Sequence, residues 1–263
     1  MRSGEELRAA FLEDRVALIP YLTAGYPTLD GAREVGEAYV AAGADILEIG
    51  VPFSDPLADG PTIQETTTRA LGNGADPAYC LQLASAFSDR RPVVFLVYYN
   101  IVFARGVEEF LDEAAEAGVS GIVVPDLPVD EARRFAQLSA ECGVAFCPLA
   151  APTSTDERLE RVGELASGFV YCVSVAGVTG VRDALPPRAV ELLRRARAKV
   201  EAPVVLGFGI GSVEAATQAA QETDGIIIGS KLMHLVGEGG PQRAYKWLRT
   251  VRHALSEVAG VGG

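Results

Sequence analysis

The feature that most constrains this chain's fold is a series of eight short apolar runs spread along its 263 residues. The runs are continuous rather than alternating, which indicates parallel strands that are covered on both faces. Most are separated by stretches of Ala, Leu, Glu and Arg with helical spacing, several of which end in Gly, as at Gly43 and Gly118. The runs span residues 16–25, 45–52, 92–100, 121–128, 144–152, 168–177, 202–210 and 224–230.

Eight strand–helix alternations predict a (β/α)8 TIM barrel, an α/β fold in which parallel strands close into a ring inside a layer of helices. An open doubly wound sheet is the alternative that the pattern alone leaves. Residues 1–15 are charged and helix-prone, so we expect an extra N-terminal helix. No linker or low-complexity segment divides the chain, which predicts one barrel domain over residues 1–263, with residues 260–263 as a flexible tail.

Composition excludes several classes of function. A formal net charge of −12 argues against sequence-independent binding to nucleic acid or to anionic membranes, because both need basic patches. We expect neither a signal peptide nor a membrane helix, since no apolar stretch reaches the roughly 18 residues that a span requires. The four cysteines show no CxxC spacing and no histidine cluster nearby, which favours buried thiols over a metal or redox site. We therefore expect a soluble cytoplasmic protein.

A carboxylate stands near the end of the second apolar run, in the segment LEIGVPFSDPLADGP (47–61). Barrel enzymes place their catalytic groups at the C-terminal ends of strands, so Glu48 is a candidate catalytic acid. It shares a strand face with Ile46, and desolvation over that apolar floor would raise its pKa, as a general acid needs. The alternative is a Glu at a fraying strand end that is solvated or paired with Arg.

Asp59 follows eleven residues later, in a loop rich in Pro and Gly. It is either the second carboxylate of a site or part of a helix start, with Pro61 at the first helical position and Asp59 or Gly60 at the cap. The segment DPLADG is not an EF-hand calcium loop, because Leu57 occupies the third position and no Glu occupies the twelfth.

Three glycine-rich turns lie late in the chain: AGVTG (176–180), GFGIGS (207–212) and IIGS (227–230). They match neither the GxGxxG nor the GKS/GKT pattern. In a barrel, the turns after the seventh and eighth strands form a phosphate site from backbone N–H groups and a helix N-terminus. Lys231 is the one basic side chain nearby, so amides and the helix dipole would hold the phosphate. The alternative is that these glycines only end strands tightly, while AGVTG is a candidate lid.

Taken together, these motifs resemble the α subunit of tryptophan synthase over nearly the whole chain. The segments PYLTAGYP, GADILEIGVPFSDPLADGPTIQ, YYNIVF, VPDLPVDE, AGVTG, GFGI and IIGS occur in the order which that family shows. The resemblance implies a phosphate-binding barrel that cleaves indole-3-glycerol phosphate to indole and glyceraldehyde 3-phosphate in L-tryptophan biosynthesis. It also implies an α2β2 complex with a β subunit that holds pyridoxal phosphate, and no cofactor in this chain.

The resemblance assigns site roles residue by residue. The catalytic positions are Glu48 as general acid/base, Asp59 as its partner carboxylate, and Tyr171 as an assisting tyrosine that from position alone is more typical of a core. The phosphate positions are Gly180, Gly209, Gly229 and Ser230. The indole pocket is lined by Tyr21, Tyr98 and Phe208. The loop-closure residues are Asp55 and Thr179. Two departures are Val175, where some members have Arg, and Tyr21, where others have Phe.

Four functions remain after this reading. The favoured one is a lyase subunit that passes indole to a β partner, and the second is a free-standing lyase that releases indole. The third is an activating subunit with negligible chemistry, against which the intact Glu48, Asp59 and Tyr171 argue. The fourth is a different phosphosugar barrel, which the two-carboxylate loop disfavours. None of the three lysines is placed to form a Schiff base; they are Lys199, Lys231 and Lys246.

Overall fold

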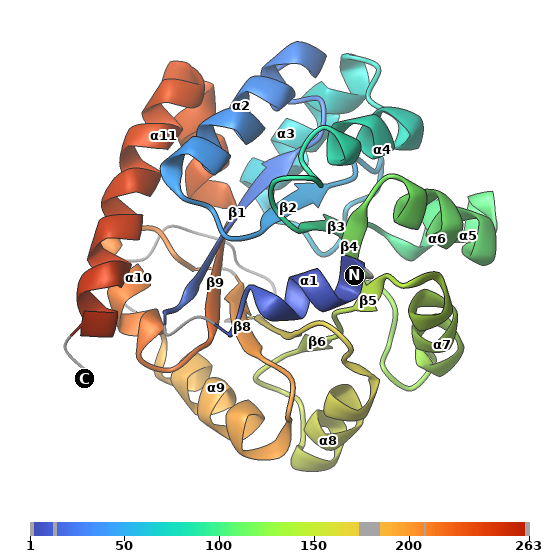
Figure 1. Cartoon of the computed structure of the whole chain (residues 1–263), viewed down its shortest axis with the longest axis vertical. Coiled ribbons are helices and arrows are strands. Elements are labelled where there is room, and N and C mark those ends of the chain that lie inside the picture. The colour runs from blue at the N-terminus through green and yellow to red at the C-terminus, as the bar shows by residue number, and fades with distance from the viewer. Residues whose placement is uncertain (1–2, 13–14, 174–184, 208, 261–263) are drawn as a thin grey trace.

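The computed structural model describes residues 3–12, 15–173, 185–207 and 209–260. In this part of the chain, nine parallel strands follow one another in the order β5-β4-β3-β2-β1-β9-β8-β7-β6, with helices around them (Figure 1). The strands are β1 (Ala17–Thr23), β2 (Leu47–Gly50), β3 (Val93–Leu96), β4 (Val119–Val123), β5 (Ala145–Phe146), β6 (Leu149–Ala150), β7 (Val170–Val173), β8 (Val204–Gly207) and β9 (Gly225–Ile228).

Apart from α1, the helices lie outside the strands and cover their outer faces (Figure 1). They are α1 (Ser3–Ala9), α2 (Leu29–Ala42), α3 (Pro61–Gly72), α4 (Pro77–Ser85), α5 (Tyr99–Arg105), α6 (Val107–Glu116), α7 (Arg133–Cys142), α8 (Asp156–Leu165), α9 (Pro187–Lys199), α10 (Val213–Ala220) and α11 (Ser230–Gly260). The expected glycine stops are confirmed at Gly43 and Gly118, whose φ angles of 95° and 78° suit a residue without a side chain.

The ring of strands closes through a broken fifth strand. The run expected at 144–152 forms two pieces, of which β5 pairs with β4 and β6 pairs with β7. The break falls at a proline, and Pro148 has no N–H with which to continue a ladder. Across it, the backbone N–H of Cys147 donates to Ile122 O, and that of Tyr171 donates to Pro148 O, both at 2.9 Å. The barrel prediction is confirmed, and the open doubly wound sheet is wrong.

The expected N-terminal helix is confirmed, and α1 lies across the ring of strands (Figure 1). Its backbone is tied to the barrel where Gly4 N donates to Gly143 O at 3.1 Å. Leu7 is fully buried, and a Cβ built on Gly121 or Gly168 would lie 2.6 or 3.1 Å from its Cδ2 atom. The side chain of Leu7 therefore fills the N-terminal end of the barrel, which leaves the opposite end for a site.

The last helix is fastened to the strands by a buried ion pair. Arg252 Nη1 of α11 lies 2.7 Å from Asp45 Oδ2, and the same oxygen accepts the N–H of Leu18 at 2.8 Å. Arg15 Nη2 contacts the other oxygen of Asp45 at 2.6 Å. α11 bends at Gly239 and Gly240, where its dihedral angles are not helical. Among the described residues, no helix is long and apolar enough to cross a membrane.

The C-terminal helix reaches into the expected tail. α11 ends at Gly260, the first of the four residues that we expected to form the tail. Residues 261–263 lie outside the described part of the chain.

Candidate active site

Glu48 lies in the interior of the barrel, two residues before β2 ends. Its neighbours in register are Tyr21 of β1 and Val94 of β3. Only 1% of Glu48 is exposed, and neither carboxylate oxygen has a hydrogen-bond partner among the described residues. The alternative of a solvated Glu at a fraying strand end is therefore wrong, and no described arginine pairs with it. Burial, reinforced by the charge of Asp59, raises the pKa of Glu48 to about 8.

Asp59 lies in the loop between β2 and α3, close enough to Glu48 for its charge to raise the pKa of that residue. The N-cap of α3 is Gly60, with Pro61 at the first helical position, so the alternative in which Asp59 is the capping residue is wrong. Burial raises the pKa of Asp59 to about 6, and a side-chain hydrogen bond with Tyr98 opposes the rise. Two carboxyl groups with separated pKa values can serve as acid and base together.

Tyr98 holds the loop that carries Asp59. It lies two residues after the end of β3, and its hydroxyl oxygen accepts the N–H of Ala58 at 3.0 Å. Its ring stacks on Phe53, with ring centroids 5.1 Å apart. Sequence reasoning missed Phe53, although an aromatic residue five positions after Glu48 in the same loop was the available signal.

Two tyrosines fill the barrel interior around the carboxyl groups. A Cβ built on Gly50 would lie 2.0 Å from Tyr21 Oη, and one built on Gly207 would lie 2.1 Å from Tyr171 Cε1. Each tyrosine ring therefore lies over a glycine near the C-terminal end of a neighbouring strand. Any residue with a Cβ atom at that glycine would clash with the ring. Tyr171 is buried, and its pKa is raised well above the ordinary value by burial and by the charges of Glu48 and Asp59. It is thus both a core residue and a neighbour of the carboxyl groups.

Three of the four expected phosphate positions, Gly209, Gly229 and Ser230, lie at the ends of β8 and β9. Gly209 follows β8 and has a φ of 87°. Gly229 and Ser230 join β9 to α11, and Ser230 is the first residue of that helix. The N-termini of α10 and α11 therefore lie beside these turns. The ammonium of nearby Lys231 lies 5.9 Å from the Trp247 ring centroid. Among the described groups here, backbone amides and helix dipoles favour an anion.

Several predicted residues cannot be compared with the structure. Gly180, Thr179 and Phe208 lie outside the described residues, as do Val175 and the rest of the AGVTG turn. Asp55, the proposed counterpart of Thr179 in loop closure, is described and exposed in the loop between β2 and α3.

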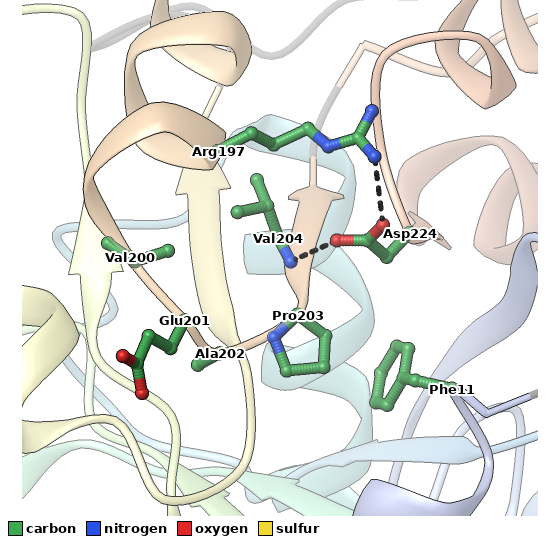
Figure 2. A pocket seen from close by; sticks show the side chains of 8 residues that line it. All are labelled: Phe11, Arg197, Val200, Glu201, Ala202, Pro203, Val204 and Asp224. Atoms are coloured by element: carbon green, nitrogen blue, oxygen red, sulfur yellow. Dashed lines mark hydrogen bonds and ion pairs between the residues drawn. The ribbon is translucent and has the colours of Figure 1, made fainter.

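A separate cavity of about 300 Å³ lies at the other end of the barrel. Figure 2 shows it beside Val204, the first residue of β8, and Asp224, which precedes β9. Asp224 accepts the N–H of Val204 at 2.7 Å and lies 3.5 Å from Arg197. Because catalytic groups of barrels gather where strands end, this cavity at strand beginnings is a structural feature and not the reaction site.

The four cysteines are free thiols, and three of them are buried; these are Cys80, Cys147 and Cys172. Within the described ranges, no group of three His, Cys, Asp or Glu side chains is arranged to hold a metal ion.

A closed parallel barrel with a buried carboxyl group that has no described partner, and a second carboxyl group beside it, has the construction of an acid–base enzyme of the TIM-barrel class. The family model described as tryptophan synthase alpha chain matches residues 7–259. The chain therefore belongs to the tryptophan synthase alpha chain family, which confirms the resemblance seen in the sequence.

Individual members of the family are similar to this chain over most of their length. The alpha chain of Rippkaea orientalis is 42% identical over 255 residues, which cover 94% of this chain and 96% of the relative. The alpha chain of Carboxydothermus hydrogenoformans is 45% identical over 222 residues, which cover 84% of this chain and 83% of the relative. A structure of Mycobacterium tuberculosis tryptophan synthase superposes with a TM-score of 0.90 at 38% identity. The match covers 97% of this chain and 98% of the other. A chain of the a2b2 complex from Pyrococcus furiosus gives 0.85 at 38% identity, covering 92% and 98%.

Proposed function

We propose that Glu48 and Asp59 carry out the alpha reaction of tryptophan synthase in this chain. The family's reaction is cleavage of indole-3-glycerol phosphate to indole and glyceraldehyde 3-phosphate, and this chain is accordingly a carbon–carbon lyase. The observation that supports the residue assignment is the Glu48 carboxyl group, which is buried, lacks a described partner and has a pKa of about 8. At neutral pH such a group is mostly protonated and can act as an acid.

The cleavage begins with a proton. Protonated Glu48 donates to carbon 3 of the indole ring, which interrupts the aromatic system and places positive charge on the ring nitrogen. Ionised Asp59 accepts a hydrogen bond from the ring N–H and stabilises that charge. With its pKa of about 6, Asp59 is mostly ionised at pH 7, while Glu48 is mostly protonated.

Bond breaking follows and restores the acid. The bond between indole carbon 3 and the first glycerol carbon breaks, and its electron pair returns to the ring. The hydroxyl group on that glycerol carbon becomes the aldehyde of glyceraldehyde 3-phosphate and gives its proton to the Glu48 carboxylate. One proton is delivered and one recovered, so Glu48 ends the cycle as it began. Tyr171, which lies beside both carboxyl groups, limits the space around the reacting carbons.

We infer that the phosphate of the substrate binds at the turns after β8 and β9. Gly229 and Ser230 lie at the start of α11, Gly209 lies three residues before Ser212, the N-cap of α10, and helix N-termini favour anions. Gly180 and Phe208 are proposed to complete the phosphate site and the indole pocket, together with Tyr21 and Tyr98. Asp55 and Thr179 are proposed to meet when the site closes.

We infer that pyridoxal phosphate belongs to the β partner and not to this chain. That cofactor forms a Schiff base with a lysine whose pKa is lowered by its surroundings. Here Lys199 pairs with Glu160 at 2.7 Å, Lys231 lies over the ring of Trp247, and Lys246 is exposed. None of the three is buried.

The β partner itself is proposed to dock on the rim of the barrel mouth. Two of the exposed large apolar side chains lie there: Leu57, 84% exposed in the loop after β2, and Phe103, 67% exposed in α5 after β3. We propose that these exposed apolar side chains belong to the interaction surface. The solved Pyrococcus furiosus relative is an a2b2 complex. The free thiols support a reducing, cytoplasmic location, and one ring of strands from Ala17 to Ile228 supports a single domain.

The experiment is indole release from indole-3-glycerol phosphate by the purified chain and by Glu48→Gln. Acid–base help is worth roughly 10²–10⁴ in rate, so the variant should lose about 3–5 kcal/mol of transition-state stabilisation. The rate of indole formation is then measured again with a β subunit added. A large increase would indicate a coupled subunit, and high activity of the isolated chain would indicate a free-standing lyase. Equal rates from the wild type and Glu48→Gln in the reconstituted complex would instead support a purely activating subunit.

A further inference from the structure

The loop between β2 and α3 depends on individual hydrogen bonds where it carries Asp59. Four of the five residues before Asp59 are exposed: Ser54, Asp55, Leu57 and Ala58. Packing therefore contributes little to fixing the path of this segment, although Asp59 itself is partly buried. On its N-terminal side Asp59 is held by its own N–H, which donates to Pro56 O at 3.0 Å.

On the C-terminal side, Asp59 is held by a side chain of α3. Gln64 Nε2 donates to the backbone carbonyl oxygen of Asp59 at 2.9 Å. A carbonyl oxygen can only accept, so the amide nitrogen of Gln64 is fixed as the donor. Among the described residues, no backbone N–H donates to this carbonyl oxygen. The Gln64 amide is therefore the group that holds this peptide unit of Asp59.

The hydrogen bond from Gln64 spans a glycine. Gly60 is the N-cap of α3, with φ −83° and ψ 172°, and it makes no side-chain cap bond. Pro61 has a fixed φ at the first helical position, whereas glycine has the widest choice of dihedral angles. Asp59 precedes the N-cap and Gln64 is the fourth helical residue, the two positions that a hydrophobic staple joins. Here a polar contact joins them and fixes the angle at which the chain enters α3.

This entry angle determines where the Asp59 carboxyl group lies. In the structure the carboxyl group makes a side-chain hydrogen bond with Tyr98, and its charge acts on buried Glu48. A change in the Gly60 dihedral angles would carry Asp59 away from Tyr98 and toward solvent, because the residues just before it are exposed. The bond from Gln64 opposes that change.

We propose that Gln64 is a positioning residue for Asp59: by holding the Asp59 carbonyl group across Gly60, it keeps the Asp59 carboxyl group beside Tyr98 in the barrel mouth. The inference rests on the proposed function only in taking Asp59 as the carboxylate that stabilises charge on the substrate. Gln64 itself is exposed on α3, so its action on the reaction is through Asp59.

The titratable groups that face Asp59 come from four other segments. They are Glu48 of β2, Tyr21 of β1, Tyr98 after β3 and Tyr171 of β7. Within the described part of the chain, the Gln64 side chain bonds to Asp59 and to none of these groups. Glutamine is uncharged, and so is methionine. A change in the titration of Asp59 on exchanging the two therefore reports the position of Asp59 and not a new charge.

The test is Gln64→Met, which keeps an unbranched side chain and a high helix propensity but removes the donor. The readout is a carbon-13 NMR titration of the Asp59 carboxyl group, identified by its loss in Asp59→Asn. Burial outweighs the Tyr98 bond in setting the pKa of Asp59. We therefore expect Asp59 in the variant to titrate below the wild-type value of about 6, closer to 3.8, as its carboxyl group becomes solvated.

A matched control is Gln82→Met. Gln82 is an exposed glutamine on α4, and its side chain makes no hydrogen bond within the described residues. This variant makes the same exchange of side chains on a helix surface away from Asp59. It should titrate like the wild type at Asp59.

Kinetics separate positioning from a loss of stability. Loss of one hydrogen bond shifts the balance between held and released Asp59 by about two- to tenfold. We expect kcat to fall by up to that factor and KM to change less, because Asp59 acts mainly on charge that develops in the transition state. In an Asp59→Asn background, adding Gln64→Met should change kcat no further.

Two results would overturn the inference. One is an Asp59 titration in Gln64→Met identical to that of the wild type, and the other is a fall in kcat of equal size in the Asp59→Asn background. A wild-type rate from Asp59→Asn would instead refute the proposed role of Asp59 in the reaction. The titration needs neither substrate nor activity, so it tests the position of Asp59 in that case too.

Discussion

The hydroxyl oxygen of Tyr98 accepts the backbone N–H of Ala58 at 3.0 Å, which ties the end of β3 to the loop that carries Asp59. The loop after β2 is therefore held by the next strand of the ring and not only by its own turns. Its aromatic residue Phe53 stacks on the same Tyr98 ring. The distance between the two proposed catalytic carboxyl groups thus depends on one side chain from a different segment.

Tyr98→Phe should shift the acidic side of the pH profile of kcat/KM, its acid limb, to higher pH. The hydrogen bond from Tyr98 lowers the pKa of Asp59, so its loss raises that pKa above about 6 and leaves less ionised Asp59 at pH 6. We expect kcat/KM to fall several-fold more at pH 6 than at pH 7.5, as the loss of one hydrogen bond to a charged group predicts. Tyr99→Phe is the matched control and should leave the acid limb in place.

The pH dependence of the wild type should be bell-shaped. The reaction needs Asp59 ionised and Glu48 protonated, so kcat/KM should rise as pH increases through about 6 and fall as it increases through about 8. Steady-state kinetics from pH 5 to 9.5 measure both limbs. Asp59→Asn should abolish the acid limb; if that limb persists unchanged, another group titrates there.

Glu48→Gln should stabilise the fold at alkaline pH while it removes activity. The pKa of Glu48 is raised from 4.5 to about 8 in the folded state, so the folded state binds the extra proton between these values. The associated stability is complete below about pH 4.5 and is lost as pH rises through 8. The variant should therefore gain, relative to the wild type, several kcal/mol in free energy of unfolding between pH 5 and pH 9. Urea unfolding at both pH values measures this; an unchanged difference would mean that Glu48 titrates normally.

Arg252→Met should destabilise the protein without touching the site. Arg252 and Asp45 are only 12% and 8% exposed, and removing one partner of a buried pair costs about 3–5 kcal/mol. Lys199→Met breaks the exposed pair with Glu160 and should cost much less, because solvent screens that pair. Chemical denaturation of both variants compares them. A loss of similar size in the two would show that the buried pair contributes no more than a surface pair.

Leu57→Ser should weaken binding of a β subunit. Leu57 is exposed on the rim of the mouth, whereas Leu12 is 82% exposed near the opposite end and supplies a control of the same residue type. Loss of one buried leucine from an interface should reduce affinity by roughly tenfold or more, which corresponds to about 1.5–3 kcal/mol. Calorimetric titration with a β subunit should show the loss for Leu57→Ser and not for Leu12→Ser; the reverse order would place the docking surface elsewhere.

The sequence allowed the ring of strands and the position of Glu48 to be predicted, because both depend on local periodicity. An apolar run predicts a strand, and a barrel fixes which end of that strand is chemically useful. It did not reveal that the fifth strand is divided, although Pro148 inside the run was a signal. The capping alternative for Asp59 was wrong because a glycine suffices as the N-cap of α3.

The contacts that organise the site could not be predicted in the same way. Tyr98 and Ala58 are 40 residues apart. Contacts at this separation depend on how whole elements pack, and no spacing within one segment encodes them. The resemblance to the family named Tyr21 and Tyr98 as pocket residues, but the bond that Tyr98 accepts from Ala58 requires the coordinates of both residues.

The division of the fifth strand at Pro148 gives the barrel a seam. β5 and β6 contain two residues each, so this part of the ring has the shortest ladders and is where transient opening of the backbone should cost least. The seam is also adjacent to the site, because the amide of Tyr171 donates to the carbonyl of Pro148. Amide hydrogen exchange should accordingly be faster at Cys147 and Tyr171 than along β1 or β2. The barrel would then open most readily beside Tyr171 and remain rigid along β1 and β2, which carry Tyr21 and Glu48.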